Sequence, residues 1–212
     1  MKTKQVLVIS SSPRRDGNSQ RLAEAFAEGA REAGHEVALV NLNDHISHFL
    51  RDCRTCRGQD GHCTISDGYR ALLYDKFLPA DGIGLATPLY WYGVSGQLKT
   101  FLDRTFCYYA ASCPDSERVI RGMLNKKFAL LVSSEETYIG AILGVLHEIQ
   151  EYARYTHSEF LGYVQGIGNK RGDVALDPNK PLARAREMGK HFFHIKYTDY
   201  RLDIGRNSSV WT

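Results

Sequence analysis

Short apolar runs alternate with longer segments of helical periodicity along this chain. Apolar runs of strand length occupy residues 5–9, 35–40, 81–87, 128–132 and 159–164. Apolar side chains recur at helical spacing within residues 18–33, 94–106, 139–153 and 182–195. Strands that alternate with helices predict right-handed βαβ crossovers and a parallel sheet. We therefore predict one α/β domain over residues 1–197, with five strands and about five helices, and a polar tail over residues 198–212.

The composition is that of an ordinary globular protein. Of 212 residues, 43% are apolar and 24% are charged, which argues against a disordered chain. No run approaches the roughly 18 apolar residues of a membrane-spanning helix, and the first residues lead into a predicted core strand rather than a signal segment. The net charge of +3 is spread along the chain, which does not indicate a nucleic-acid footprint. We expect a soluble, cytoplasmic protein without membrane or nucleic-acid partners.

A polar loop, residues 10–19, joins the first predicted strand directly to the first predicted helix. Its sequence is Ser-Ser-Ser-Pro-Arg-Arg-Asp-Gly-Asn-Ser. A helix N-terminus presents backbone N–H groups without partners and the positive end of the helix dipole, so it suits a phosphate. Ser12, Asn18 and Ser19 add side-chain donors. The loop is a candidate phosphate site, although an ordinary polar strand-to-helix turn would have the same composition.

Two further loops are expected beside this one, because ligands of open α/β sheets bind beyond the carboxyl ends of the strands. They are residues 87–96 after the third predicted strand and residues 133–138 after the fourth. The first of them places Tyr90, Trp91 and Tyr92 in a turn between Pro88 and Gly93, where polar residues are usual. Exposed aromatic side chains suit stacking on a flat ring. We expect one of the three to pack in the core instead, and Gly93 to permit either a close backbone approach or a positive φ.

These motifs carry a family resemblance. Ser-Ser-Pro-Arg-Arg-Asp-Gly-Asn-Ser after the first strand, together with the segment Thr-Pro-Leu-Tyr-Trp-Tyr-Gly-Val-Ser-Gly-Gln-Leu-Lys-Thr-Phe-Leu-Asp-Arg over residues 87–104, resembles the flavodoxin-like NAD(P)H-dependent FMN reductase family. The resemblance spans most of residues 4–165. It implies a flavodoxin-like, doubly wound five-stranded parallel sheet of order 2-1-3-4-5, non-covalent FMN, and a homodimer or homotetramer.

The resemblance also implies which residues contact the cofactor. The phosphate would be held by Ser12, Asn18 and Ser19, with Arg14 assisting. Ser10 and Gly17 of the same loop are also expected to contact the cofactor. The isoalloxazine ring and its polar edge would be lined by Pro88, Leu89, Tyr90, Trp91 and Gly93. In the third loop, Ser133, Ser134 and Glu135 match by position only. The Asp103-Arg104 pair belongs to the same motif, and we interpret it as a structural ion pair or helix cap.

The resemblance implies an enzyme that takes a hydride from NAD(P)H and passes electrons to a small acceptor such as a quinone, a flavin, an azo or a nitro compound. The flavin carries that chemistry, so no catalytic side chain is predicted. A flavodoxin-type electron carrier without turnover is the alternative, although such carriers tend to be acidic and this chain is mildly basic. A flavin-free module that binds a phosphorylated ligand is a third possibility.

The cysteine segment, residues 53–63, resembles the cluster-binding loop of iron-sulfur flavoproteins but departs from it. Gln59 stands where a third cysteine is expected, and cluster ligation normally takes four thiolates, so no iron-sulfur centre is predicted. Zinc would need one histidine in addition, the candidates being Cys53, Cys56 and Cys63 with His45, His48 or His62. The spacing lacks a second ligand pair, so we predict no metal. With five cysteines and no secretory signal, we expect buried or redox-sensitive thiols in a loop beside the flavin site.

Two further segments carry no predicted helix or strand and are interpreted separately. The glycine string over residues 166–172 has the wrong spacing for a dinucleotide fingerprint, and we interpret it as a surface loop. The connection over residues 107–126 is longer than is usual between a helix and a strand. A lid over the flavin and a subunit contact would both use its Tyr108 and Tyr109.

Overall fold

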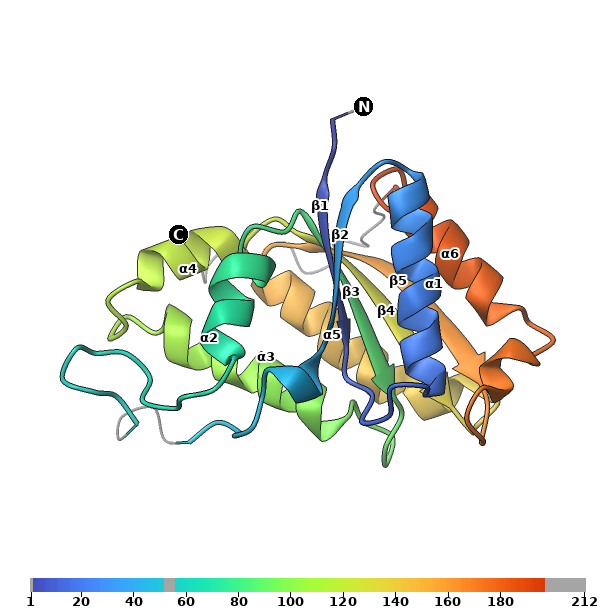
Figure 1. The fold of residues 1–212 in the computed structure, drawn as a ribbon, viewed down its shortest axis with the longest axis horizontal. Helices are drawn as coiled ribbons and strands as arrows, with labels where there is room; N and C mark the ends of the chain where they lie inside the picture. The colour runs from blue at the N-terminus through green and yellow to red at the C-terminus, as the bar shows by residue number, and fades with distance from the viewer. Residues whose placement is uncertain (1, 52–55, 197–212) are drawn as a thin grey trace.

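A five-stranded parallel sheet forms the centre of the protein, whose computed structural model describes residues 2–51 and 56–196 (Figure 1). Its strands are β1 (Gln5–Ser10), β2 (Glu36–Asn41), β3 (Gly82–Pro88), β4 (Lys127–Ser134) and β5 (Glu159–Ile167). They pair in the order β2-β1-β3-β4-β5, each parallel to its neighbours. The parallel sheet predicted from the alternation of elements and the order implied by the family resemblance are both confirmed.

Helices cover both faces of the sheet (Figure 1). One face carries α1 (Asn18–Glu32) and α6 (Pro181–Lys190). The other carries α2 (Tyr69–Leu72), which continues as a π-helical turn (Leu73–Phe77), and then α3 (Gly96–Tyr109), α4 (Ser116–Met123) and α5 (Leu143–Tyr155). Short 3-10 turns occupy Leu42–Asp44, Ile139–Ile142 and Asp173–Ala175.

Each buried strand contributes side chains to two hydrophobic cores, one on each face of the sheet, because successive side chains point to opposite faces. In β1, Leu7 and Ile9 pack toward α2, α3 and α5, whereas Val6 and Val8 pack toward α1 and α6. Both faces are therefore dry, which is why the predicted strands read as continuous apolar runs. No helix among the described residues combines the length and the apolar character that crossing a bilayer requires.

The connection over residues 107–126, for which a lid and a subunit contact were both left open, is mostly helical. Helix α3 runs to Tyr109, and α4 begins at Ser116. Tyr108 is only 2% exposed and stacks on Tyr69 with ring centroids 5.5 Å apart, so it serves the core. It continues the buried face of α3 seven residues after Phe101, a spacing that fits two helical turns. At the other end of the chain, the last helix is shorter than its apolar pattern, since α6 ends at Lys190.

Arg104 forms a buried ion pair that ties the long segment before α2 to the middle of α3. Its guanidinium donates to both carboxylate oxygens of Asp67, at 2.6 and 3.0 Å, and to the carbonyl of His48 at 3.0 Å. Burial alone would raise the pKa of Asp67, but the hydrogen bonds from Arg104 and from the Ser47 backbone lower it below its ordinary value. The structural role expected for Arg104 is confirmed, with Asp67 as its partner instead of Asp103.

Helices α1 and α6 touch through their backbones at two glycines. A Cβ atom on Gly29 would lie 1.9 Å from the carbonyl oxygen of Arg186, and one on Gly189 would lie 2.0 Å from that of Phe26. Only glycine allows this approach. The tail predicted over residues 198–212 lies outside the described residues, so the domain boundary at residue 197 stays a prediction.

We expect Gly189→Ala to destabilise the protein, because its methyl group would force two helix backbones apart. Overpacking of this kind costs about 1–3 kcal/mol in the free energy of unfolding. The matched control is Gly96→Ala in the first turn of α3, where an added Cβ meets nothing within 4 Å. Urea denaturation should give a lower midpoint for Gly189→Ala at unchanged slope, and an equal or higher midpoint for Gly96→Ala. Equal midpoints for Gly189→Ala and the parent would contradict the close approach.

Candidate functional site

The loops that follow β1, β3, β4 and β5 lie side by side at the carboxyl edge of the sheet. Backbone pairing continues past the strand ends: Ser11 N donates to the carbonyl of Ala86 at 2.8 Å, and Leu89 N to that of Ser133 at 2.8 Å. Gly168 N donates in the same way to the carbonyl of Ser134 at 2.9 Å. The register of the parallel sheet therefore brings these loops together, as the strand-end rule predicts.

A cavity of about 280 Å³ lies between these loops. It is lined by Ser12, Arg14, Gly17, Asn18, Ser19, Pro88, Leu89, Tyr90, Ser133, Ser134, Glu135, Glu136, Gly168 and Asn169. Three residues expected at the cofactor are not part of its wall: Ser10, Trp91 and Gly93. Ser10 ends β1 inside the core, where its fully buried hydroxyl has no hydrogen-bond partner in the described part of the chain.

Glu136, Gly168 and Asn169 line the cavity and were missed by the sequence reasoning. Gly168 and Asn169 belong to the glycine string that was interpreted as a surface loop. The string follows the last strand of the sheet, so the same strand-end rule could have placed it at this edge. The mismatch with the dinucleotide fingerprint argues against that one motif, but it does not bear on where the string lies in the fold.

The N-terminus of α1 faces this cavity without a side-chain cap. Gly17 occupies the N-cap position in extended conformation, and within the described part of the chain this 15-residue helix has no side-chain cap hydrogen bond. The backbone N–H groups of that turn are therefore available to an anion. Ser12 shapes the loop, because its hydroxyl donates to the carbonyl of Arg14 at 2.8 Å. A Cβ on Gly17 would lie 2.6 Å from this hydroxyl and 3.2 Å from the carbonyl oxygen of Arg14, so a side chain here would force the Ser12 hydroxyl to move.

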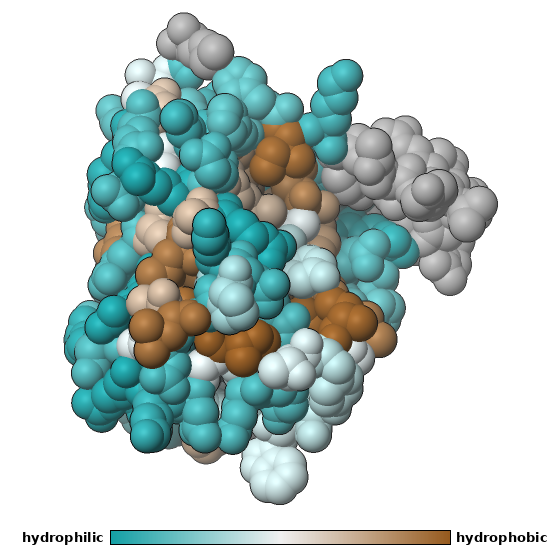
Figure 2. All heavy atoms as spheres, turned by 90° about the vertical axis from the view of Figure 1, so that its right-hand side faces the viewer, coloured by the Kyte–Doolittle hydropathy of each residue, from teal (hydrophilic) through white to brown (hydrophobic). Residues whose placement is uncertain are grey.

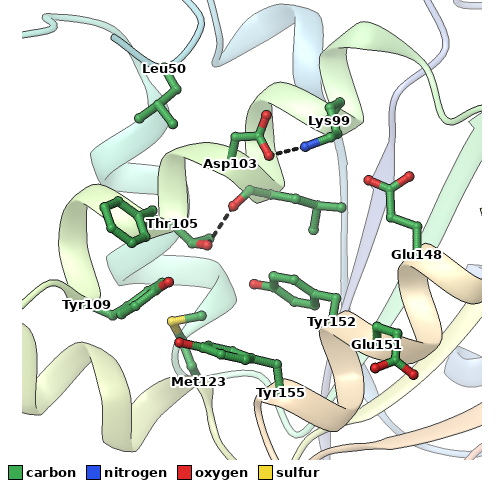
Figure 3. A pocket seen from close by; sticks show the side chains of 12 residues that line it. Leu50, Lys99, Asp103, Thr105, Tyr109, Met123, Glu148, Glu151, Tyr152 and Tyr155 are labelled. Atoms are coloured by element: carbon green, nitrogen blue, oxygen red, sulfur yellow. Dashed lines mark hydrogen bonds and ion pairs between the residues drawn. The ribbon is translucent and has the colours of Figure 1, made fainter. Parts of the chain in front are cut away.

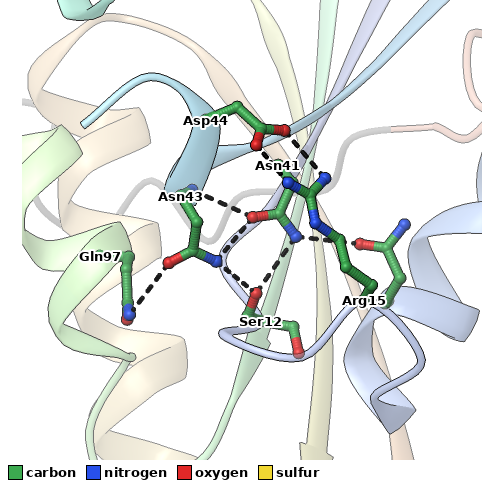
Figure 4. A network of polar contacts seen from close by, with 7 residues as sticks. Ser12, Arg15, Asn41, Asn43, Asp44 and Gln97 are labelled. Carbon is green, nitrogen blue, oxygen red and sulfur yellow. Dashed lines mark hydrogen bonds and ion pairs between the residues drawn. The ribbon is translucent and has the colours of Figure 1, made fainter. Parts of the chain in front are cut away.

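The two neighbouring arginines of the loop have different surroundings. Arg15 pairs with the exposed carboxylate of Asp44, and its Nη1 donates to Oδ2 at 2.9 Å (Figure 4). The hydrogen bond from Arg15 lowers the pKa of Asp44. Arg14 lines the cavity instead. Of the pair, Arg14 is thus the residue placed to meet an anion at the helix N-terminus.

Two asparagines from the end of β2 hold the loop from behind. The Nδ2 atoms of Asn41 and Asn43 both donate to the carbonyl of Ser12, at 3.1 and 2.8 Å (Figure 4). Gln97 at the start of α3 donates in turn to Asn43 Oδ1 at 3.4 Å. The carbonyl of Ser12 is therefore satisfied by two amides that do not belong to the wall of the cavity.

The side chain of Asn18, which we expected to hold the phosphate, makes its hydrogen bonds within the chain. Its Nδ2 donates to the carbonyls of Gly168 and Lys170, at 3.1 and 3.0 Å, and its Oδ1 accepts from the N–H of Gly172 at 2.9 Å. The side-chain amide is thus engaged within the chain, so it braces the glycine string against α1. Asn18 contributes to the wall of the cavity, but its amide is not a free donor for a ligand.

The aromatic segment after β3 forms a tight two-residue turn. Tyr90 and Gly93 exchange backbone hydrogen bonds of 3.1 and 3.0 Å, with positive φ at Trp91 (48°) and Tyr92 (61°). Positive φ at both central residues defines a type I′ turn. The positive φ angles therefore occur at the two aromatic residues and not at Gly93. None of the three aromatics packs in the core, since Tyr90, Trp91 and Tyr92 are 45%, 97% and 53% exposed.

A larger cavity, of about 460 Å³, lies between α3 and α5 (Figure 3). Its wall includes Phe106, Tyr109, Tyr152 and Tyr155, with Glu148 at one side. Burial raises the pKa of Glu148. None of the residues predicted to bind the cofactor belongs to this wall, and the cavity lies along the helices instead of at the sheet edge. The candidate functional site is therefore the smaller cavity.

The cysteine loop lies elsewhere than expected. Cys56 and Cys63 come together with Cys107 of α3, and no cysteine lines either cavity described above. Histidines 45, 48 and 62 do not belong to this group of sulfur atoms. Cys53 lies outside the described residues. The loop packs on the last turn of α3, whereas the aromatic turn precedes the first turn of this helix, so the loop is not beside the candidate site.

A family model of the flavodoxin-like fold matches residues 4–176. The chain belongs to the flavodoxin-like family. Among curated relatives of this flavodoxin-like protein, YwqN of Bacillus subtilis, assigned by name to the NAD(P)H-dependent FMN-containing oxidoreductases, is 26% identical over 190 residues. The match covers 85% of this chain and 94% of YwqN. An iron-sulfur flavoprotein of Methanocaldococcus jannaschii is 37% identical over 100 residues, which is 47% of this chain and 51% of that protein.

Solved structures show the same flavodoxin-like fold. The Trp repressor binding protein from Bacillus subtilis superposes with a TM-score of 0.66 at 22% identity, over 86% of this chain and 98% of its own. The NAD(P)H:quinone oxidoreductase from Methanothermobacter marburgensis superposes with a TM-score of 0.63 at 19% identity, over 93% and 100%. At such identities the likeness concerns the fold alone.

The wall of the cavity in this flavodoxin-like protein combines groups of both charges. Arg14 and the uncapped N-terminus of α1 supply positive charge. Glu135 and Glu136 also belong to the wall, and Asn169 Nδ2 donates to Glu135 Oε1 at 2.9 Å. The hydroxyl of Ser134, another residue of the wall, donates to the carbonyl of Glu136 at 2.8 Å. The cavity therefore offers donors for an anionic group together with polar groups for the rest of a ligand.

Proposed function

We propose that this flavodoxin-like protein is an FMN-dependent oxidoreductase that takes a hydride from NAD(P)H and reduces a small acceptor. The observation that carries the proposal is the convergence of an uncapped helix N-terminus with an exposed aromatic turn at one sheet edge. FMN has a phosphate at one end and a flat ring at the other, so it needs both features at once. The assignment of YwqN to FMN-containing oxidoreductases supports the same cofactor.

The phosphate end of the proposed site rests mainly on backbone donors. The N–H groups in the first turn of α1 would bind the phosphate oxygens, with the hydroxyl of Ser19 beside them, while Ser12 keeps the shape of the loop. Arg14 would add a positive charge opposite the dianion. The absence of a side chain at Gly17 supports this assignment, because a Cβ there would lie 2.6 Å from the Ser12 hydroxyl in the wall of the cavity.

The ring end would be formed by the strand-end loops. Pro88, Leu89 and Tyr90 line the cavity beside the helix N-terminus, and Ser133 and Ser134 line it from the neighbouring loop. FMN, when bound, would accept the hydride and pass on the electrons. The protein's task is to orient the ring and leave one face accessible.

The approach to the ring is bordered by exposed aromatic side chains. Trp91 is 97% exposed, and Tyr138, which is 56% exposed, hydrogen-bonds with Tyr92 across the loops. This hydrogen bond raises the pKa of Tyr138. Flat acceptors such as quinones, free flavins, azo dyes or nitroaromatics would stack on such a border. A small planar acceptor is therefore the substrate class that we propose.

A visible spectrum of the purified full-length chain tests the cofactor and the reaction together. We expect the absorption of oxidised flavin, its loss when NADPH or NADH is added without oxygen, and its return when a soluble benzoquinone follows. Repeated additions should give many turnovers per flavin. A colourless protein that does not take up FMN would overturn the proposal. Bound flavin that neither nucleotide reduces would indicate the flavodoxin-type carrier without turnover.

We expect Arg14→Gln to weaken FMN binding about 10-fold, because loss of an exposed cation beside a phosphate removes about 1.4 kcal/mol. The matched control is Arg15→Gln, whose guanidinium is paired with Asp44 and should change the dissociation constant little. Fluorescence titration of the apoprotein measures both. Riboflavin, which lacks the phosphate, should bind parent and Arg14→Gln equally. A loss of riboflavin affinity as large as that for FMN would contradict the phosphate role.

We also propose that the protein is a homodimer or homotetramer. The exposed apolar side chains Phe106 and Tyr155 beside the cavity between α3 and α5 support this assembly. Sedimentation velocity should show a dimer or tetramer for the parent and a shift toward monomer for Phe106→Glu. Leu176→Glu, at an 81% exposed position away from this cavity, should sediment like the parent. A parent that is monomeric at tens of micromolar would refute the proposal.

A further inference from the structure

Three cysteine side chains form a compact group of sulfur atoms outside the candidate functional site. The Sγ atoms of Cys56, Cys63 and Cys107 all lie within 4.8 Å of one another. Cys56 and Cys107 are 6% and 2% exposed, and Cys63 is partly exposed. Two members come from the loop before α2, and the third comes from the last turn of α3, 44 residues further along the chain.

The backbone holds the first two cysteines in a small hairpin. Arg57 and Cys63 form an antiparallel bridge, and Gly58 N donates to the carbonyl of His62 at 2.9 Å. Thr64 closes the hairpin, because its N–H and its hydroxyl both donate to the carbonyl of Cys56 at 2.8 Å. Cys56 and Cys63 are therefore fixed relative to each other before any ligand is considered.

Arg57 fastens this hairpin to α3. Its Nη1 donates to the carbonyl of Gly61 within the hairpin at 2.6 Å, and its Nη2 donates to the carbonyl of Cys107 at 2.6 Å. One side chain thus sets the position of Cys107 against the two hairpin cysteines. Its positive charge beside the group also favours the thiolate forms that bind metals.

The spacing of the sulfur atoms suits one metal ion. Zinc binds thiolates at about 2.3 Å, which places the sulfurs of a tetrahedral site about 3.8 Å apart. The observed group would have to contract by about 1 Å at most. A four-iron cluster separates its thiolates by the width of the cluster and normally needs four of them. The described residues bring three together, and Gln59 lies where the loop of iron-sulfur flavoproteins would supply another.

We propose that Cys56, Cys63 and Cys107 bind a single Zn²⁺ ion that staples the hairpin to the end of α3. Binding would deprotonate the three thiols, and their protons would pass to solvent, so affinity falls as the pH is lowered. The metal would form three Zn–S bonds, and the fourth position would be taken by water or another ligand. No thiol is oxidised in this step.

The site is structural and not catalytic. Cys107 follows Gly96, at the start of α3, by eleven residues, and at 1.5 Å per residue this is about 16 Å along the helix. Gly96 adjoins the aromatic turn, so the metal would lie remote from the cavity that we assign to FMN. Metal loss should therefore loosen residues 56–64 without removing flavin, and failure of either proposal leaves the other standing.

Metal analysis of the full-length, FMN-loaded protein tests the inference. Protein grown with zinc should hold about one equivalent by mass spectrometry of the elements, and Cys107→Ser should lose it. Competition with a chromophoric chelator should show that Cys107→Ser binds zinc at least about 100-fold more weakly than the parent does. Added Co²⁺ should give the d–d bands of a tetrahedral thiolate site at wavelengths beyond the flavin absorption. Hydrogen exchange of residues 56–64 should accelerate when zinc is removed.

Cys113→Ser is the matched control, because Cys113 is also buried, 3% exposed, but does not belong to the group. It should keep the zinc, the cobalt bands and the flavin of the parent. Equal metal loss in both variants, or no metal and no cobalt bands in the parent, would overturn the proposal. Iron and inorganic sulfide in stoichiometric amounts in the purified protein would overturn the zinc proposal in favour of an iron-sulfur cluster. A disulfide among the three cysteines, found by mass spectrometry after alkylation without reductant, would replace it by an oxidised thiol pair.

Discussion

The register of the parallel sheet is the constraint on which the site depends. Ser10 pairs with Ala86, and Pro88 with Ser133, so the three loops leave the sheet at nearly the same level. Helix α1 packs closely on β3 because the strand has a glycine there. A Cβ on Gly84 would lie 3.0 Å from the ring of Phe26 in α1. The helix that presents its N-terminus to the cavity is thus seated directly on the central strand. The site is a consequence of strand pairing and needs no separate scaffold.

The chain divides its polar groups between bracing and binding. Amide side chains make the braces: Asn41 and Asn43 hold the carbonyl of Ser12, and Asn18 holds the glycine string. Backbone N–H groups of α1 are left for a ligand. An amide side chain has both donors and acceptors and can satisfy several backbone groups at once, so it suits irregular loops. The rigid loop then presents backbone donors at fixed positions, which reduces the ordering needed when an anion binds.

Local patterns predicted the sheet well, and pairings between distant segments were beyond their reach. Apolar runs such as the one from Phe128 to Val132 carry their strand character in a few consecutive residues. The partner of Arg104 is 37 residues earlier, and no spacing rule links it to Asp67. Cys107 was likewise counted in a connection and not in the cysteine group, because only the folded chain brings α3 against the hairpin. The eight-residue helix α4 is too short for its period to stand out.

The aromatic turn carries a consequence for how this protein can change over evolutionary time. Trp91 and Tyr92 hold left-handed backbone conformations that cost about 1–2 kcal/mol each in residues other than glycine, asparagine and aspartate. An asparagine-glycine pair makes the same turn without this cost. Substitutions that raise thermal stability at Trp91 and Tyr92 would therefore remove the aromatic rings. Homologous chains that keep bulky aromatics here would mark a selective pressure on the rings themselves, separable from any pressure on the fold.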